Sequence, residues 1–308
     1  MNITTYIRQA KNGYIRTSLP ILLSGLLVLF SSCTLAEDYD ADTELECDRD
    51  VYLCEDYQAW QVRFALGLGG RTNPLINSSD IPLLVMPQIS YYDEKFFIDN
   101  LNMGYTLIET DTLTLNVITD MNYDRVFFSR TDPGNILLQS LIADGITVGN
   151  LPQEGQADSI AIAPSALNRK ISYLAGLGLI WLDDNHRLDI ELFEDISNIH
   201  DGREVRIAYE YFYQNGDWTF NPEVELVWKS DEINTYYYGY TNEEYLIDYQ
   251  ADAGLNFSLG LNVINTIDDH WFWLGKLSYM KLSDQISNSP LVEKDYSITT
   301  FIGLVYTF

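Results

Sequence analysis

The chain has 308 residues, of which 46% are hydrophobic and 13% aromatic, and it carries a formal net charge of −27. So acidic a chain repels a nucleic-acid backbone, and no cluster of basic residues offsets the charge, which excludes nucleic acid as a partner. The high apolar and aromatic content excludes an intrinsically disordered chain.

Residues 1–36 are predicted to be an export signal. Three basic residues and no acid precede an apolar run of twelve residues, 19–30. Such a run is too short for a membrane-spanning helix and has the length of a signal-peptide core. Small residues before Glu37 offer a cleavage site, and cleavage there changes the formal charge from −27 to −30. Lipidation at Cys33 is the alternative.

Residues 37–59 are predicted to be an acidic periplasmic leader. Ten acids and one arginine lie between Glu37 and Asp56, and like charges at this density keep a segment solvated and extended. The leader is expected to be either a spacer or a docking arm for a basic periplasmic partner. Cys47 and Cys54 are expected to form a local disulfide in an oxidising periplasm, with two unpaired thiols as the alternative.

Residues 60–308 are predicted to form an all-β fold, a transmembrane antiparallel up-and-down β-barrel of about twelve strands. Apolar residues alternate with small or polar ones, which places one set on lipid and the other in the lumen. The expected strands are 60–70, 81–92, 94–101, 103–109, 112–125, 171–183, 186–194, 203–213, 217–229, 248–263, 270–282 and 295–308. A soluble β-sandwich also alternates, but its strands average about five or six residues, and most of these are longer.

Two further patterns favour the membrane. Aromatic residues lie near strand ends, where a girdle is expected at each interface; they are Trp60, Tyr123, Trp181, Trp218, Trp228, Trp271, Trp273 and Tyr306. Long and short connections alternate, which is typical of a barrel with long outer loops and tight periplasmic turns. The predicted outer loops are 71–80, 129–170, 195–202, 230–247 and 283–294.

Two segments are singled out by their position. The last strand ends in Tyr306 and Phe308, which are expected to be the assembly signal that barrel-assembly machinery recognises before the chain enters outer-membrane lipid. The longest loop, 129–170, is predicted to hold a short helix over 135–143 and to act as a lumen plug or an outer contact surface.

Charges of both signs are predicted to face the lumen: Arg63, Glu191, Arg206, Glu210, Glu223, Glu225 and Lys276. A polar lumen can hold a water path, but mixed charges can also pair and close a narrow interior, and the second outcome is favoured. No catalytic, cofactor-binding or metal-binding constellation is evident in the sequence. The three histidines lie in predicted turns and loops, and His200 is expected to be a solvated loop residue.

Three parts of the chain resemble the MipA/OmpV family of outer-membrane proteins. They are residues 87–105, the segment Tyr236-Tyr237-Tyr238-Gly239 with acidic residues downstream, and the ending 301–308. The resemblance covers roughly residues 60–308 and implies a barrel that is a scaffold for murein-synthesising complexes. The partners it implies are a membrane-bound lytic transglycosylase and a bifunctional penicillin-binding protein. Other family members are linked to osmotic response and adhesion.

The sequence therefore predicts a non-enzymatic protein of the Gram-negative outer membrane that anchors or organises peptidoglycan enzymes. Its contacts are expected through the short turns and the leader. Two alternatives stay open: a small pore or uptake channel that prefers cations, and a surface adhesin that acts through loops 129–170 and 230–247.

Overall fold

The computed structural model describes residues 59–128, 164, 167, 169–240 and 248–308. The predicted export signal, the acidic leader with Cys47 and Cys54, and the predicted helix 135–143 lie outside these residues. No helix among the described residues is long and apolar enough to cross a membrane.

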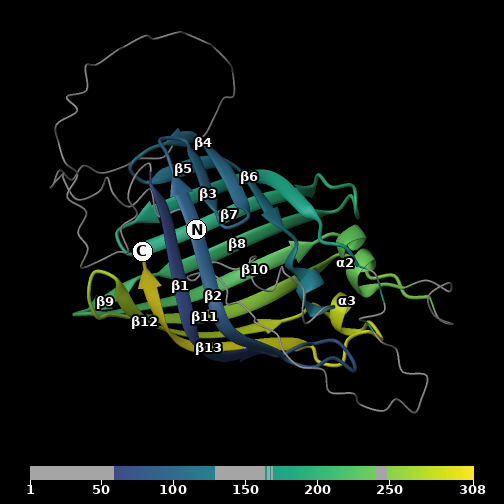
Figure 1. The fold of residues 1–308 in the computed structure, drawn as a ribbon. Coiled ribbons are helices and arrows are strands. Elements are labelled where there is room, and N and C mark those ends of the chain that lie inside the picture. Colours follow the sequence, from purple (N-terminus) through teal and green to yellow (C-terminus); the bar gives the residue numbers. More distant parts are fainter. Residues whose placement is uncertain (1–58, 129–163, 165–166, 168, 241–247) are drawn as a thin grey trace, which may run out of the picture.

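One antiparallel sheet that closes on itself makes up the fold (Figure 1). Its strands are β1 (Trp60–Arg71), β2 (Ile81–Tyr92), β3 (Phe96–Asp99), β4 (Asn102–Glu109), β5 (Leu113–Met121), β6 (Tyr173–Asp183), β7 (His186–Asp195), β8 (Arg203–Tyr211), β9 (Tyr213–Asn215), β10 (Trp218–Lys229), β11 (Gly254–Thr266), β12 (Trp271–Lys281) and β13 (Tyr296–Thr307). β8 and β9 are two parts of one crossing, interrupted at Phe212, and both pair with β10. The barrel therefore has twelve crossings, as the sequence predicted.

The first and last strands close the barrel. β13 pairs with β1 over nine positions, from Arg63 opposite Thr307 to Arg71 opposite Thr299. Gly67 faces Gly303 at the middle of this seam. A Cβ atom at Gly67 would lie 2.2 Å from the backbone oxygen of Ile302, so the two strands can approach this closely only because the residue is glycine.

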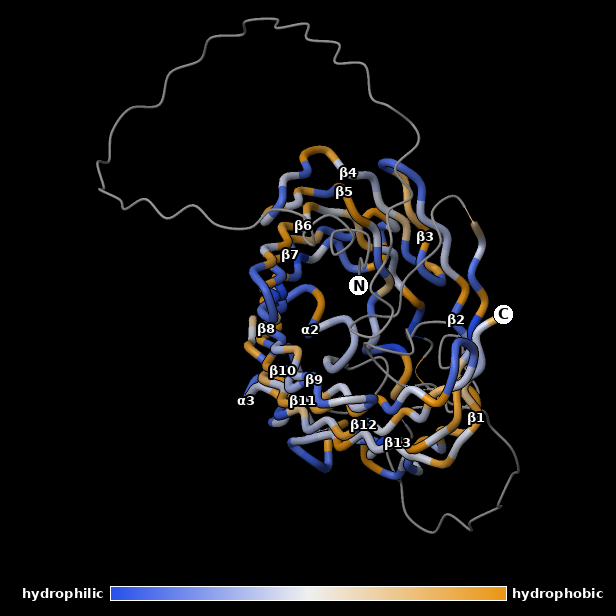
Figure 2. Tube along the Cα trace, turned by 90° about the vertical axis from the view of Figure 1, so that its left-hand side faces the viewer, coloured by the Kyte–Doolittle hydropathy of each residue, from blue (hydrophilic) through white to orange (hydrophobic). Residues whose placement is uncertain are grey.

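Alternate side chains form an apolar outer belt around the barrel. On β1, Leu66 and Leu68 are 63% and 72% exposed, whereas Arg63 and Ala65 are buried. Figure 2, which looks along the barrel, shows the same alternation of hydrophobic and hydrophilic positions along the strands. An apolar surface that encircles a protein is stable against lipid and not against water, so the barrel spans a membrane.

The two ends of the barrel differ. The end called here the inner end carries the start of β1, the end of β13 and five short turns. Five of the six tryptophans lie on strands next to it: Trp60, Trp181, Trp218, Trp271 and Trp273. The opposite, outer end carries the longer connections with the helices η2 (Tyr123–Phe127), α2 (Asp231–Tyr238) and α3 (Asp284–Ser287). Short turns face the periplasm in barrels of this kind, so the inner end is the periplasmic one.

Three of the predicted strands have the wrong bounds. The strand predicted over 94–101 is only four residues long, because Asn100 turns the chain with a φ of 53°. The one predicted to reach 125 ends at Met121, because the Asn122 side chain accepts the N–H of Asp124 and starts η2. The one predicted to begin at 248 begins at Gly254, and Tyr249 bridges to Tyr240 instead.

The predicted outer loop 230–247 lies at the outer end, and its first half forms α2. Asp231 and Glu232 lie in the first turn, where acids favour the positive end of the helix dipole. Ile233 and Tyr237 are four residues apart and face the same side. Tyr236, Tyr237 and Tyr238 of the Tyr-rich motif therefore lie on a helix, and Gly239 directly follows it.

A steric test of the closing seam follows from Gly67. Gly67→Ala is expected to lower the free energy of unfolding by about 1–3 kcal/mol, because the added methyl group pushes β13 away from β1. Urea unfolding in detergent, followed by tryptophan fluorescence, measures the change. Gly275→Ala is the matched control, since the nearest atom to a Cβ there would be the backbone oxygen of Val263 at 3.8 Å. Equal losses for the two variants would contradict the role given to Gly67.

Candidate functional site: a capped lumen

A packed apolar cluster, called here the cap, lies over the outer end of the barrel. It consists of Leu75, Ile81, Val126, Phe127, Phe128, Leu167, Ile233, Tyr237, Tyr238, Tyr240, Leu282, Ile286 and Leu291. These side chains come from η2, α2, α3, the start of β2 and the neighbouring connections, which are far apart in the sequence. Burial of their apolar surface holds the outer loops together across the barrel mouth. In Figure 2, α2 lies within the outline of the ring of strands.

The tyrosines of the family motif belong to the cap. Tyr237 and Tyr238 are fully buried, and Tyr236 packs against the same cluster. Burial raises the pKa of Tyr237 and Tyr238 well above the ordinary value for tyrosine, so both hydroxyl groups stay neutral. Gly239 follows directly, and a Cβ there would lie 2.4 Å from the backbone oxygen of Thr235. The motif therefore builds the cap.

Asp124 ties the cap to the barrel wall. Its Oδ2 accepts a hydrogen bond from Lys229 Nζ at 2.5 Å, and its Oδ1 accepts one from the Tyr238 hydroxyl at 2.8 Å. Both ends of the ion pair are buried. A buried ion pair depends on both partners, because removal of one leaves the other charge uncompensated. Neither residue was singled out in the sequence, and they are 105 positions apart.

Arg206 is the centre of a second ionic cluster, on the wall below the cap. Its Nε donates to Glu204 at 2.5 Å, and its guanidinium also pairs with Asp120 and, at 3.8 Å, with Glu191. The guanidinium carbon lies 4.7 Å from the centre of the Phe193 ring, a cation–π distance. Arg206 lies inside the barrel, and its charge is matched by carboxylates.

Tyr123, predicted for the outer aromatic girdle, lies elsewhere. It belongs to η2, and its ring is 5.7 Å from the guanidinium carbon of Arg206. The Asn122 turn that ends β5 directs it inward, a local hydrogen bond that alternation does not reveal.

A cavity of about 280 Å³ lies in the lumen beneath the cap. Its walls carry nine acids, Asp99, Asp120, Asp124, Asp189, Glu191, Glu204, Glu210, Glu223 and Glu225, and five basic residues, Arg71, Arg187, Arg206, Lys229 and Lys276. Of the seven charges expected in the lumen, all but Arg63 line it. Arg63 is buried nearer the inner end, where its guanidinium donates to Gln61 at 2.8 Å and to Gln88 at 3.4 Å.

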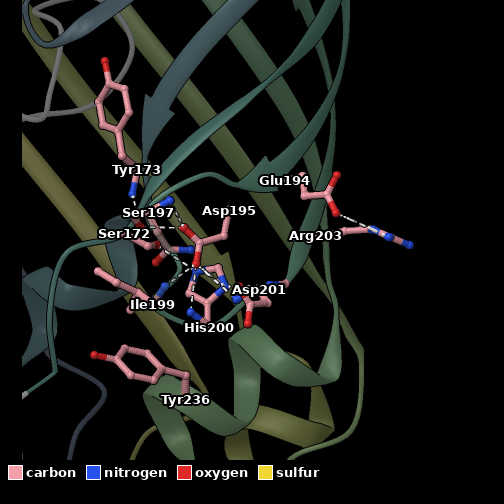
Figure 3. A network of polar contacts seen from close by, with 12 residues as sticks. Ser172, Tyr173, Glu194, Asp195, Ser197, Ile199, His200, Asp201, Arg203 and Tyr236 are labelled. Carbon is pink, nitrogen blue, oxygen red and sulfur yellow. Dashed lines mark hydrogen bonds and ion pairs between the residues drawn. The ribbon is translucent and has the colours of Figure 1, made fainter.

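A serine, a histidine and an aspartate meet at the outer end of β7 (Figure 3). His200 Nε2 lies 2.8 Å from Ser172 Oγ, and His200 Nδ1 lies 3.6 Å from Asp195 Oδ2. However, Nδ1 accepts the backbone N–H of Gly202 at 2.9 Å, so the ring proton lies on Nε2 and points to the serine. A general base needs a free Nε2 lone pair toward its nucleophile. The arrangement therefore positions the loop and does not activate Ser172.

Asp195 organises this loop through its carboxylate. It accepts the backbone N–H groups of Ser197, Ile199 and His200 at 2.8 Å and that of Asp201 at 3.1 Å. The loop folds back as a result, and the His200 side chain is buried against Ser172 and Tyr237. The expectation that His200 is solvated is therefore wrong. An aspartate two residues before a Ser-Asn pair, Asp195 before Ser197 and Asn198, was the available signal for such a turn.

Among the residues the structure describes, no three His, Cys, Asp or Glu side chains gather closely enough to hold a metal ion.

The Asp124–Lys229 pair yields a test of how the cap is held. Asp124→Leu is expected to lower the free energy of unfolding by about 3–5 kcal/mol, because the Lys229 cation stays buried without its partner. In the double variant Asp124→Leu with Lys229→Met, much of this loss is expected to return, since no charge is left uncompensated. Denaturant unfolding in detergent measures both. A double variant less stable than the single one would contradict the pairing.

The burial of His200 yields a pH prediction. Burial lowers the pKa of His200 below the unfolded value of about 6.5, so below that pH the unfolded chain binds the proton more readily. The stability contributed by neutral His200 is present above pH 6.5. It is lost as the pH falls from there toward the lower pKa that His200 has in the folded protein. Hydrogen exchange in α2 and the 196–202 loop is expected to speed up between pH 7.5 and 5.5, after correction for intrinsic rates. His200→Gln should abolish this dependence, and His186→Gln, at an inner turn, should keep it.

Several known proteins are similar to this chain in sequence. The family described as MltA-interacting protein MipA matches residues 66–308. A protein named MltA-interacting protein, from Escherichia coli K12, is 24% identical over 251 residues, which cover 80% of this chain and 90% of the relative. Outer membrane protein OmpV of Vibrio cholerae is 26% identical over 102 residues, which cover 32% of this chain and 40% of the relative.

Solved outer-membrane barrels align with most of the chain. The NanC porin covers 80% of this chain and 98% of its own length, at 12% identity and a TM-score of 0.38. An outer membrane channel from Pseudomonas putida F1 covers 85% and 99%, at 13% identity and a TM-score of 0.38. The relatives named as outer-membrane proteins and the apolar belt agree on an outer-membrane location. Since the family match runs from β1 to the last residue, the chain belongs to the family of the MltA-interacting protein MipA.

Proposed function

We propose that this protein is a non-enzymatic outer-membrane scaffold that binds periplasmic enzymes of peptidoglycan synthesis and remodelling. The cap is the observation that carries the proposal, because thirteen buried apolar residues occupy the mouth through which a solute would enter. A barrel capped in this way offers its outer surfaces for contact. The Escherichia coli relative is named for its interaction with MltA, and the family resemblance implies a lytic transglycosylase and a penicillin-binding protein as partners.

The inner end offers the contact surface. Its short turns and the strand ends beside them carry nine acids and one lysine: Asp93, Glu94, Lys95, Glu109, Asp111, Asp183, Asp184, Asp217, Asp268 and Asp269. A ring of like charge attracts a partner of opposite charge and raises its association rate. The partner surface is therefore expected to be basic, and the acidic leader would extend the same field.

Photo-crosslinking in living cells tests the scaffold. A photoreactive residue at Asp184 or Asp217, at the inner end, is expected to capture a lytic transglycosylase or a penicillin-binding protein, identified by mass spectrometry. The same residue at Asp80, in the outer loop after β1, is the control and should capture neither. Deletion of 37–56 then shows whether the leader contributes. The proposal fails if no peptidoglycan enzyme is captured from any inner-end position.

A small channel that prefers cations is the second candidate, and the charged cavity is the observation that favours it. Planar-bilayer recording separates the two. The scaffold predicts a silent bilayer, because the cap covers the outer mouth. Single-channel currents whose cation preference falls in Glu223→Gln would favour the channel instead.

The adhesin alternative relied on the Tyr-rich loop 230–247 and on loop 129–170. Within the described part of the first loop, Tyr237, Tyr238 and Tyr240 are buried in the cap.

A further inference from the structure

We propose that the barrel wall binds an acyl chain of lipopolysaccharide, the lipid of the outer leaflet, in a notch between β2 and β5. The notch is bordered by residues 81–88 of β2, by Asn100 and Leu101 of the turn between β3 and β4, and by the end of β5 from Thr119 to Met121. It lies in the side of the barrel and shares no residue with the acidic turns of the inner end, so the proposal is independent of the scaffold function.

Two short strands create the notch. β3 has four residues and β4 has eight, whereas a strand that crosses a bilayer needs about nine to eleven. β3 pairs with β2 only from Ser90 to Tyr92, and Asn100 continues this pairing to Ile89. Beyond Ile89, residues 81–88 of β2, about 25 Å of strand, have no strand beside them on this side in the described part of the chain. The wall is therefore incomplete toward the outer end.

The backbone at this edge of β2 opposes the addition of a further strand. The Asn100 side chain accepts the N–H of Ile89 at 3.0 Å, and the Asn100 N–H donates to the Ile89 carbonyl at 2.7 Å. The register from Ile89 to Val85 is regular, so the backbone groups of Val85 and Pro87 point to the same edge as those of Ile89. Pro87 has no N–H, and a proline at an edge disfavours strand pairing. The carbonyl oxygens of Val85 and Pro87 are left facing the opening.

Two hydroxyl groups tie the turn to β5 and leave the opening on the β2 side. Thr119 Oγ1 accepts the N–H of Met103 at 3.0 Å and donates to the Met103 carbonyl at 3.1 Å. The Tyr173 hydroxyl donates to the Leu101 carbonyl at 2.9 Å. Side chains therefore take the place of a strand for these backbone groups, and the border beside β5 is already satisfied.

The side chains around the notch are apolar. Leu101 and Met121 pack against the cap, so the cap forms the floor of the notch. Leu84 and Met103, which are 38% and 42% exposed, border it on the outside and belong to the apolar outer belt. The notch is therefore continuous with the surface that faces lipid, and a lipid chain can enter it from the membrane and gain dispersion contacts with a packed surface.

The chemistry of the notch distinguishes between the lipids of the two leaflets. A carbonyl oxygen at membrane depth is costly without a donor, and those of Val85 and Pro87 face the opening. Acyl chains of lipopolysaccharide include amide-linked chains that carry hydroxyl groups, so they combine an apolar body with N–H and O–H donors. The ester-linked chains of a phospholipid offer acceptors alone. The notch therefore favours lipopolysaccharide.

Photo-crosslinking from Leu101 tests the site. The full-length protein, with a diazirine-bearing residue in place of Leu101, is extracted from outer membranes and exchanged into dodecyl maltoside before irradiation. A covalent adduct with lipopolysaccharide is expected by intact mass, because a chain held in the notch survives the exchange. The same probe at Leu259, on the exposed belt of β11, is expected to capture detergent alone, and at Leu282, inside the cap, neither.

Two results at Leu101 would overturn the proposal, whatever the capture of periplasmic enzymes shows. One is loss of the lipid adduct to the level of Leu259, since the chain would then be ordinary bilayer lipid. The other is an adduct with phospholipid in place of lipopolysaccharide.

A variant that fills the notch locates the binding. Val85→Trp, on the open edge of β2, is expected to reduce the lipid adduct at Leu101 at least fivefold. Val224→Trp is the matched control, because Val224 is exposed on β10 with a strand on either side, and it should leave the adduct unchanged. Leu84→Trp gives the same comparison if Val85→Trp does not fold, as judged by heat-modifiable gel mobility. Equal loss in the control variant would contradict the site.

Other occupants of the notch give different products. If residues 129–163 fill it, the probe at Leu101 forms an intramolecular crosslink that peptide mapping assigns to those residues, and their deletion raises the lipid adduct. If a second copy of the chain fills it, a crosslinked dimer appears. Either product in place of the lipid adduct would overturn the proposal.

Discussion

The hydrogen-bonded seam between β1 and β13 is the constraint on which the rest of the structure depends. A bilayer offers no water to the backbone, so every N–H and C=O group at membrane depth needs a partner within the protein. An open sheet would leave two edges without partners, and closure removes both. The close approach of Gly67 to the backbone of β13 shows how tightly the edges meet. Once the ring is closed, the side chains have only two destinations, lipid or lumen.

Closure creates an interior that must be filled, and the chain fills it in two ways. Near the outer end, η2, α2 and α3 contribute apolar side chains to the cap. Below it, charged residues pair across the wall, as Arg206 does with Asp120 and Glu204. The boundary between the two regions is Asp124, which contacts Lys229 of the wall and Tyr238 of the cap. The carboxylate of Asp124 therefore couples the cap to the polar lumen.

This division assigns different tasks to different parts of the barrel. The capped outer end is built for stability, because its polar groups, including His200 and Ser172, are used to hold loops in place. The inner end is a ring of exposed acidic turns with the aromatic residues of β1, β12 and β13 beside it, and it is the surface open to a periplasmic partner. Between them lies a lumen in which acidic side chains outnumber basic ones.

The period of two in the sequence was enough to predict the barrel, its twelve crossings and the outward face of the last strand, because each strand repeats one local choice between lipid and lumen. The same rule placed Arg206, Glu210, Glu225 and Lys276 inside. It did not predict that Tyr123 turns inward, since the local hydrogen bond between Asn122 and Asp124 overrides alternation there. It also did not predict that residues 231–238 form a helix. The Asp124–Lys229 pair, the bond from Tyr238 of the cap to Asp124 and the burial of His200 depend on contacts between residues 28 to 114 positions apart. Such contacts exist only once the barrel has closed and brought the outer loops together. They belong to the tertiary structure, and no periodic pattern in the amino-acid sequence predicts them.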